Sequence, residues 1–230
     1  MKIIFVRHGH PNYELNCLTE LGHQQAAAVA QRLINEGIEE IYCSPYGRAI
    51  ETAEHTAAAL GLEIKILEFM HEIVWGDPDK PEKKSGYPWI IAEKMVRSGD
   101  DLLRPDWCSN SPFKDNLLIK HCDWLNGELD KWLKTIGYTR EGNAYRVAKN
   151  TNRTIALFSH GGSSVAAISH LMNLPIPYAA YVLHPDFTSI IELEFGDEEG
   201  SLTMPRFGLV HDTKHIAVLK NPESGKVLVL

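Results

Sequence analysis

The stretch Lys2-Ile-Ile-Phe-Val-Arg-His-Gly9 decides the fold of this chain. Its apolar part favours a buried β-strand, which ends in an arginine, a histidine and a glycine where the backbone must turn. A second stretch, Thr154-Ile-Ala-Leu-Phe-Ser-His-Gly-Gly162, repeats this arrangement late in the chain. In an open parallel sheet, ligands bind beyond the carboxyl ends of the strands. We therefore expect His8 and His160 to share one site at such an edge.

The residues that follow the first strand favour alternating helices and strands. Helices are predicted from Thr19 to Gly37 and from Ser44 to Gly61, where apolar residues recur at three- and four-residue spacing. Short apolar runs at 40–43 and 63–67 predict strands. Arg48 falls in the first turn of the second helix. Its guanidinium and the dipole of that helix can both attract an anion beyond the sheet edge, which suits a phosphate group.

The amino-acid composition changes between residues 75 and 148, where all five tryptophans and five of the twelve prolines lie. One amphipathic helix is predicted at 118–136, and loops are predicted at 78–86 and 99–112. We interpret 75–148 as a cap insertion within a single domain of residues 1–230, and its tryptophans mainly as packing residues. A helix at 163–173 and paired strands at 189–195 and 204–210 complete the prediction.

Several motifs in this order resemble the histidine phosphatase superfamily, the group that contains phosphoglycerate mutases and related phosphatases. The motifs are Arg7-His-Gly9, Leu18-Thr-Glu-Leu-Gly22, Ser44-Pro-Tyr-Gly-Arg-Ala-Ile-Glu-Thr-Ala53, Glu72 within Met70 to Gly76, and Ser159-His-Gly-Gly162. The resemblance covers nearly the whole chain and favours the phosphatase branch. It implies a phosphoglycerate mutase-like α/β fold: a three-layer sandwich with a mostly parallel central sheet, flanking helices and a cap of helix and loop.

The resemblance also implies a phosphoryl-transfer site. Neutral His8 would attack phosphorus to form a phosphohistidine, while a backbone carbonyl orients its other ring nitrogen. Arg7, Arg48 and a protonated His160 would bind the nonbridging oxygens together with backbone amides near Gly161. Because this cationic pocket takes the place of a metal ion, we expect neither a metal nor a cofactor.

Glu72 is the implied proton donor to the leaving oxygen. A carboxyl group in this role needs a raised pKa, which apolar neighbours such as Ile73 can provide. Glu68 lies four residues earlier and is the competing carboxylate. Asn12 is a further candidate for phosphate binding, although the family's usual asparagine falls where this chain has Tyr13 and Glu14.

Alternatives to these roles remain at this point. Arg48 can pair with Glu51 or Glu54 on its own helix, and His160 can be a structural histidine in a glycine-rich turn. Phosphoglycerate mutase-type transfer and a non-catalytic phospho-ligand binding protein are the alternatives to a metal-independent phosphomonoester hydrolase. The short segment after Gly9 favours a phosphatase over a mutase, and no Gly-x-Ser-x-Gly elbow supports an esterase.

The amino-acid composition excludes some classes of binding partner. The net charge of −7 argues against nucleic-acid and anionic-membrane surfaces. Four scattered cysteines and the lack of a long apolar stretch favour a cytoplasmic protein. The expected partner is a small phosphorylated substrate. Sugar phosphates, phosphoglycerates, nucleotides and phosphorylated proteins all stay open, as does the oligomeric state. Three lysines at 80, 83 and 84 can either recruit a second acidic group or form a solvated charge run.

Overall fold

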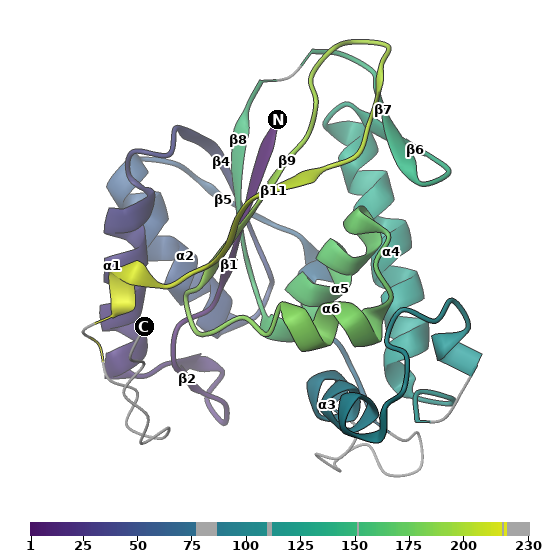
Figure 1. The fold of residues 1–230 in the computed structure, drawn as a ribbon. Coiled ribbons are helices and arrows are strands. Elements are labelled where there is room, and N and C mark those ends of the chain that lie inside the picture. The colour runs from purple at the N-terminus through teal and green to yellow at the C-terminus, as the bar shows by residue number, and fades with distance from the viewer. Residues whose placement is uncertain (77–86, 110–111, 151, 218, 220–230) are drawn as a thin grey trace.

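The computed structural model describes residues 1–76, 87–109, 112–150, 152–217 and 219. Its central sheet has six strands in the order β11-β9-β1-β8-β4-β5 (Figure 1). These strands are β1 (Lys2–Arg7), β4 (Ile38–Cys43), β5 (Ile64–Ile66), β8 (Thr154–Ser159), β9 (Ile190–Glu194) and β11 (Arg206–Asp212). The four strands β1, β8, β4 and β5 are parallel, whereas β9 is antiparallel to both β1 and β11. The predicted mostly parallel sheet is confirmed.

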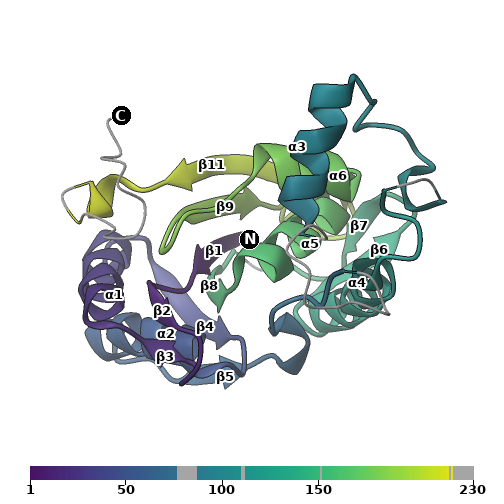
Figure 2. The same cartoon turned by 90° about the horizontal axis from the view of Figure 1, so that it is seen from below.

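Helices cover both faces of this sheet (Figure 2). On one face lie α1 (Glu20–Leu33) and α2 (Gly47–Leu60), and on the other lie α4 (Leu117–Thr135), α5 (Gly161–Met172) and α6 (Ile176–Val182). Alternate residues of β1 enter the two resulting cores: Ile3 and Phe5 join one cluster, while Ile4 and Val6 join the other. The apolar middle of β1, Ile3 to Val6, is thus buried on both sides, as expected for a three-layer sandwich.

Local chemistry sets the bounds of the first two helices. Thr19 caps α1 by accepting a hydrogen bond from the Gly22 amide, but the helix ends at Leu33, before the predicted stop at Gly37. The start of α2 also differs from the prediction, because the Ser44 amide still bonds to the Phe158 carbonyl and extends the edge of β4. Gly61 ends α2 with φ of 67°, a conformation that favours glycine.

The segment from 75 to 148 contains more regular structure than the sequence predicted. The helix predicted at 118–136 is confirmed as α4, but α3 (Pro88–Ser98) was not predicted, although Pro88 begins it and Gly99 ends it with φ of 77°. A short turn of 3-10 helix, η3 (Trp107–Ser109), lies in the predicted loop at 99–112. The other predicted loop, 78–86, lies outside the described residues.

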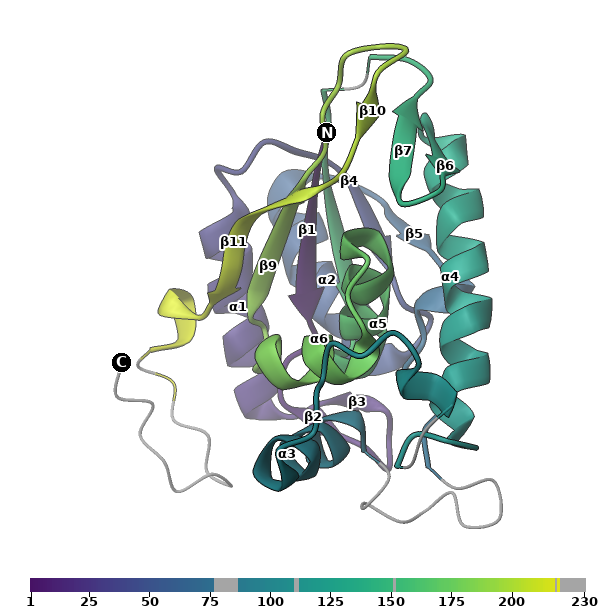
Figure 3. The ribbon, with the colours of Figure 1, turned by 45° about the vertical axis from the view of Figure 1, so that its right-hand side comes forward.

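A small second sheet completes this segment. It pairs β6 (Tyr138–Glu141) with β7 (Ala144–Val147), and β7 with β10 (Leu202–Thr203). The buried face of α4 shares one core with α5, so this helix is a layer of the main fold. In contrast, α3 packs on α6 at the end of the molecule toward which β1 points (Figure 3). A cap role for 75–148 stays a prediction.

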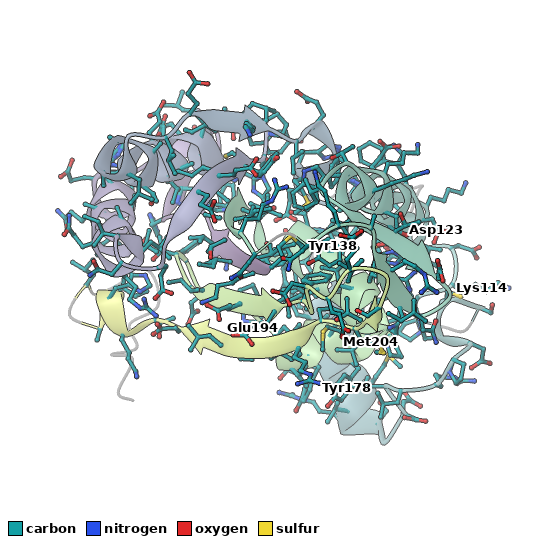
Figure 4. All side chains as sticks on the ribbon, turned by 90° about the horizontal axis from the view of Figure 1, so that it is seen from above. Lys114, Asp123, Tyr138, Tyr178, Glu194 and Met204 are labelled. Atoms are coloured by element: carbon teal, nitrogen blue, oxygen red, sulfur yellow. The ribbon has the colours of Figure 1, made fainter. Side chains whose placement is uncertain are left out.

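The two ends of the sheet differ in what they carry. Figure 4 views the molecule from the side opposite to that of Figure 2 and labels Tyr138 of β6 and Glu194 of β9. At this end of the sheet, the Tyr138 hydroxyl donates a hydrogen bond to the carbonyl of Gly196 at 2.9 Å. At the end seen in Figure 2, β1 leads into a two-stranded hairpin of β2 (Pro11–Asn12) and β3 (Cys17–Leu18). None of the described helices is long and apolar enough to cross a membrane.

Candidate active site

The predicted site residues follow the carboxyl ends of four neighbouring parallel strands. Arg7 ends β1 and is followed by His8, while His160 comes directly after β8 as the residue that caps α5. Arg48 lies in the first turn of α2, which follows β4. Glu72 comes after β5 and the short helix η1 (Glu68–Met70). The fold therefore gathers at one sheet edge residues that are more than 150 positions apart in sequence.

The ring of His8 is buried and held in one orientation. Its Nδ1 lies 2.8 Å from the carbonyl oxygen of Gly9, which can only accept, so Nδ1 carries the proton. Nε2 is left with its lone pair and accepts a hydrogen bond from Nε of Arg48 at 3.3 Å. Burial, and then the positive charge of Arg7, hold the pKa of His8 well below its ordinary value. His8 is therefore a neutral imidazole at neutral pH.

Gly9 makes the turn after His8 possible. A β-carbon at this position would lie 2.6 Å from the carbonyl oxygen of Gly22 at the start of α1, which is closer than real contacts allow. The Gly9 amide donates to the Thr52 hydroxyl at 3.0 Å, and this hydroxyl donates to the Arg48 carbonyl at 2.7 Å. The nucleophile candidate is thus connected to the first turn of α2 by backbone contacts that need the small residue.

His160 lies beside His8, with 5.1 Å between the two ring centroids. Its Nε2 is 2.7 Å from the hydroxyl oxygen of Ser44, and its buried Nδ1 has no hydrogen-bond partner in the described part of the chain. Burial, followed by the charges of His8 and Arg48, holds the pKa of His160 well below its ordinary value. The ring is therefore neutral in the free site, and the protonated His160 expected with a bound phosphate stays a prediction.

Glu72 has the setting that a proton donor requires. One carboxyl oxygen, Oε1, accepts hydrogen bonds from the amides of Ile73 at 2.9 Å and Ser163 at 3.0 Å. Burial raises the pKa of Glu72, and this effect prevails over the hydrogen bonds and the nearby Arg7, which lower it. The predicted direction of the pKa shift is confirmed. With Oε1 held by the two amides, Oε2 is the oxygen left to carry a proton.

The two arginines are oriented by contacts with other residues of the protein. Arg7 donates to the Pro185 carbonyl at 2.6 Å, and its guanidinium lies over the Phe187 ring, 4.2 Å from the centroid. Its buried Nε has no partner among the described residues. Arg48 donates to Oδ1 of Asn16 at 2.7 Å. Both guanidiniums are therefore fixed before any anion arrives.

Neither Glu51 nor Glu54, the alternative partners of Arg48, forms an ion pair with it among the described residues. Glu51 accepts a hydrogen bond from the Leu18 amide at 2.6 Å and so stabilises the hairpin at the start of α1. No contact of Arg48 with Glu54 is found among the described residues. Arg48 instead donates hydrogen bonds to His8 and Asn16. The fold therefore favours a place for Arg48 in the site over an ion pair on its own helix.

Asn16 was missed by the sequence analysis. Asn12 was the candidate, but its Oδ1 accepts hydrogen bonds from the amides of Glu14 and Leu15 and so closes its own turn, and its phosphate-binding role stays a prediction. Asn16 adopts φ of 52° and thereby aims its side chain at Arg48. Asparagine tolerates this left-handed conformation better than most residues. An asparagine in the turn after the first strand was therefore the feature of the sequence that could have pointed to Asn16.

A cavity of about 750 Å³ opens in front of these residues. Arg7, Arg48, Glu72 and Gly161 line the part of it that we call the phosphate end, whereas His8 and His160 are buried and are not among its lining residues, and His8 accepts the hydrogen bond from Arg48. The remaining lining residues were not predicted as site residues: Tyr13, Tyr46, Ile73, Val74, Trp75, Tyr87, Trp89, Val165, Ala180, His184 and Pro185. Two of the tryptophans interpreted as packing residues therefore face this cavity.

Comparison with known proteins agrees with this geometry. The family model of the histidine phosphatase superfamily (branch 1) matches residues 3–90, which include Arg7, His8, Arg48 and Glu72. A relative from Hydrogenobacter thermophilus named "Putative phosphoserine phosphatase 2" is 23% identical over 185 residues, which cover 80% of each chain.

Solved structures share the whole fold. Phosphoserine phosphatase from Entamoeba histolytica, in complex with 3-phosphoglyceric acid, has a TM-score of 0.62 and 23% identity, covering 94% of this chain and 98% of its own. A mutant of that enzyme with phosphoserine has a TM-score of 0.59 and 25% identity over the same shares. Mycobacterial glucosyl-3-phosphoglycerate phosphatase has a TM-score of 0.63 and 18% identity, covering 92% and 99%.

The fold, the family model and the clustered strand-end residues agree. Over residues 3–90 the chain is similar to the histidine phosphatase superfamily, and its whole fold is similar to the folds of phosphoserine phosphatase and glucosyl-3-phosphoglycerate phosphatase. The class of enzyme that the comparisons support is a phosphatase.

Proposed function

We propose that the chain is a metal-independent phosphomonoester hydrolase that acts through a phosphohistidine on His8. The observation that carries this proposal is the state of the His8 ring. Its proton is held at Nδ1 by the Gly9 carbonyl at 2.8 Å, so Nε2 keeps its lone pair, which accepts a hydrogen bond from Arg48 in the free site. A buried neutral imidazole with one unprotonated nitrogen is a nucleophile rather than a cation that binds phosphate.

In the first step, Nε2 of His8 attacks phosphorus and a new P–N bond forms. The P–O bond to the leaving group breaks, and the departing oxygen takes the proton of Glu72. This proton lowers the barrier because an alkoxide is a poor leaving group, and the raised pKa of Glu72 keeps the proton available. The products of this step are an alcohol, phosphohistidine and the Glu72 carboxylate.

In the second step, Glu72 acts as a base. Its carboxylate removes a proton from water, the oxygen of that water attacks phosphorus, and the P–N bond breaks. Inorganic phosphate leaves and the lone pair returns to Nε2 of His8, while Glu72 is again protonated. One carboxyl group serves both steps because it faces the same phosphorus atom from the side of the leaving group.

Charge on the phosphoryl oxygens is balanced by Arg7, Arg48 and His160. In the free site Arg48 donates its Nε–H to Nε2 of His8, so a bound phosphate must take over this hydrogen bond before attack. The buried Nδ1 of His160 and Nε of Arg7 have no partners in the described structure, and a phosphoryl oxygen would supply one. A dianion beside His160 also favours its protonation, which reverses the pKa shift of the free site.

Inorganic phosphate release from ethyl phosphate, phosphoserine and 3-phosphoglycerate, measured with EDTA present, tests this proposal. Turnover of at least one ester that is lost in His8→Ala and kept in His23→Ala would support it. His23 is a half-exposed histidine on α1 and serves as the matched control. Phosphoryl transfer to a second hydroxyl without phosphate release would instead identify a mutase. Tight binding without turnover would identify a binding protein.

A further inference from the structure

Besides the phosphate-binding residues, a cluster of aromatic rings lines the cavity. Trp75, Tyr87 and Trp89, which we call the aromatic wall, all line this cavity and are half-buried. Their ring centroids lie 5.0 Å (Trp75–Tyr87), 5.2 Å (Trp75–Trp89) and 5.3 Å (Tyr87–Trp89) apart. The two contacts of Trp75 are edge-on, at 76° and 74°, which holds the rings in place and leaves part of each ring to the cavity.

His184 extends the aromatic wall toward α6. Its ring contacts Trp89 edge-on with 5.8 Å between centroids. Desolvation, and then the charge of Arg7, lower the pKa of His184, so the ring is uncharged at neutral pH. Aliphatic side chains of Ile73, Val74 and Val165 line the same cavity. The surface near the aromatic wall is therefore apolar.

Two arginines are the cationic side chains among the described lining residues, and the charge of one of them, Arg7, reaches His184. They are Arg7 and Arg48, which are anchored to the Pro185 carbonyl and to Asn16. A carboxylate placed against the faces of the rings in the aromatic wall would lose hydration without gaining a hydrogen bond from the faces.

The cavity also has more room than a phosphoryl group fills. Its volume of about 750 Å³ lies in the range that holds drug-sized organic molecules. An aromatic ring placed edge-on or offset against tryptophan is bound more tightly than the burial of its area alone would give. An uncharged aromatic group thus matches both the size and the chemistry of this part of the cavity.

Building on the proposed function, we infer that the substrate class is phosphomonoesters with an uncharged aromatic leaving group, bound against Trp75, Tyr87 and Trp89. This class differs from the ligands of the similar Entamoeba structures, which carry carboxylates. The recognition is assigned to the side chains of the aromatic wall, and the phosphoryl chemistry stays with His8.

Three phosphate esters of primary alcohols test this inference: 2-phenylethyl phosphate, ethyl phosphate and 3-phosphoglycerate. Their alkyl leaving groups have similar reactivity, so differences in kcat/KM report recognition. We expect kcat/KM to be about 10-fold higher or more for the phenylethyl ester than for ethyl phosphate, from burial and ring contact. Equal values, or a preference for 3-phosphoglycerate or for added glucose 6-phosphate, would overturn the inference.

Substitutions of single residues test whether the preference for the phenylethyl ester comes from the aromatic wall. Trp89→Leu keeps apolar bulk but removes the ring, and we expect it to reduce the preference for the phenylethyl ester about 5-fold or more while ethyl phosphate turnover changes less than about 3-fold. Trp89→Phe should restore most of the preference. Trp124→Leu is the matched control, because Trp124 is 45% exposed on α4 and does not line the cavity. A loss that is equal for both esters would contradict recognition by the ring.

A binding measurement separates this inference from the proposed function. If no ester is hydrolysed, the hydrolase proposal fails, but calorimetry with 2-phenylethylphosphonate and ethylphosphonate still tests the aromatic wall. About 10-fold tighter binding of the phenylethyl compound, lost in Trp89→Leu, would support the substrate class. Equal affinity of the two phosphonates would reject it.

Discussion

The two ends of the cavity are built in different ways. The phosphate end takes its side chains from segments that follow β1, β8, β4 and β5, and His8 and His160 are almost fully buried there. The aromatic wall comes from one short part of the chain, and its rings are half-buried. The edge of the sheet thus supplies the reacting groups, whereas the connection between β5 and α4 supplies the surface that meets the rest of a substrate. Substitutions at the two ends should therefore affect different kinetic quantities.

The largest effect is expected for His8→Ala. Removal of the proposed nucleophile should lower kcat for every ester by about 10⁴-fold or more, because neither end of the cavity can replace a covalent step. Inorganic phosphate release under saturating ester measures this loss. A variant that keeps more than a tenth of the parent activity would show that the phosphate end works without His8.

Glu72→Gln should give the next largest effect, and the effect should depend on the leaving group. We expect kcat/KM, which reports the first step, to fall approximately 10²–10⁴-fold for alkyl phosphates, whose leaving oxygen needs a proton, and much less for 4-nitrophenyl phosphate, whose leaving group does not. The kcat should fall for both esters, because Glu72 also activates water in the second step. An equal loss of kcat/KM for both esters would contradict proton donation by Glu72.

The pH profile gives the same carboxyl group a second test. Attack requires neutral His8, whose lowered pKa keeps it neutral down to pH values below its ordinary range. Donation requires protonated Glu72, so its raised pKa sets the alkaline fall of kcat/KM for alkyl esters. Activity should decrease as the pH rises through this pKa, and Glu72→Gln should abolish this alkaline fall. Persistence of the fall in the variant would assign it to another group.

Arg48→Ala should cost about 10²–10³-fold in kcat, the usual effect of removing one preorganised donor. Arg48 is held by Asn16 at 2.7 Å, so Asn16→Ala should give a smaller loss, of about 10-fold, through misplacement of the guanidinium. Double-mutant analysis measures the coupling. If the two losses simply multiply, Asn16 does not act through Arg48.

Two adjacent glycines at the start of α5 give a matched pair. A β-carbon on Gly162 would lie 2.6 Å from Oε1 of Glu72 and 2.5 Å from Ile73, whereas on Gly161 it would meet Arg7 at an ordinary 3.6 Å. Gly162→Ala should therefore destabilise the fold by about 1–3 kcal/mol and displace Glu72, with kcat/KM falling more for alkyl phosphates than for 4-nitrophenyl phosphate. Gly161→Ala should have a much smaller effect on thermal unfolding, and equal effects of the two substitutions would contradict the close contact.

The smallest effect is expected far from both ends of the cavity. Gly127 lies in α4, where a β-carbon would meet no heavy atom within 4 Å. Gly127→Ala should stabilise the fold by roughly 0.5–1 kcal/mol through helix propensity, with unchanged kinetics for every ester. Denaturant unfolding measures the gain, and a change in ester preference would show that α4 influences the aromatic wall.

The phosphate end was predictable because its residues obey a local rule. An apolar strand that ends in a charged or glycine-rich turn identifies both His8 and His160 without knowledge of their neighbours. Arg48 was predictable from its place in the first turn of a helix. Asn16 was not, because its contact with Arg48 depends on the hairpin of β2 and β3 and on a left-handed backbone at one residue.

The aromatic wall was not predictable from local pattern. Tryptophan is equally suited to a core and to a ligand surface, and only the path of the chain decides which it meets. Trp132 is buried in the core under β4, while Trp75 and Trp89 line the cavity. The protonation of His160 was also beyond the sequence, because it depends on how closely Arg7, Arg48 and His8 crowd the ring.

The most direct test of the central claim is to trap the phosphoenzyme. The parent protein, incubated briefly with a ³²P-labelled phosphomonoester and quenched in alkali, should carry a label that is stable in base and labile in acid, and peptide mapping should place it on His8. The label should be absent from His8→Ala and accumulate if the second step is slowed. A label on another residue, or phosphate release by His8→Ala at the parent rate, would contradict the account.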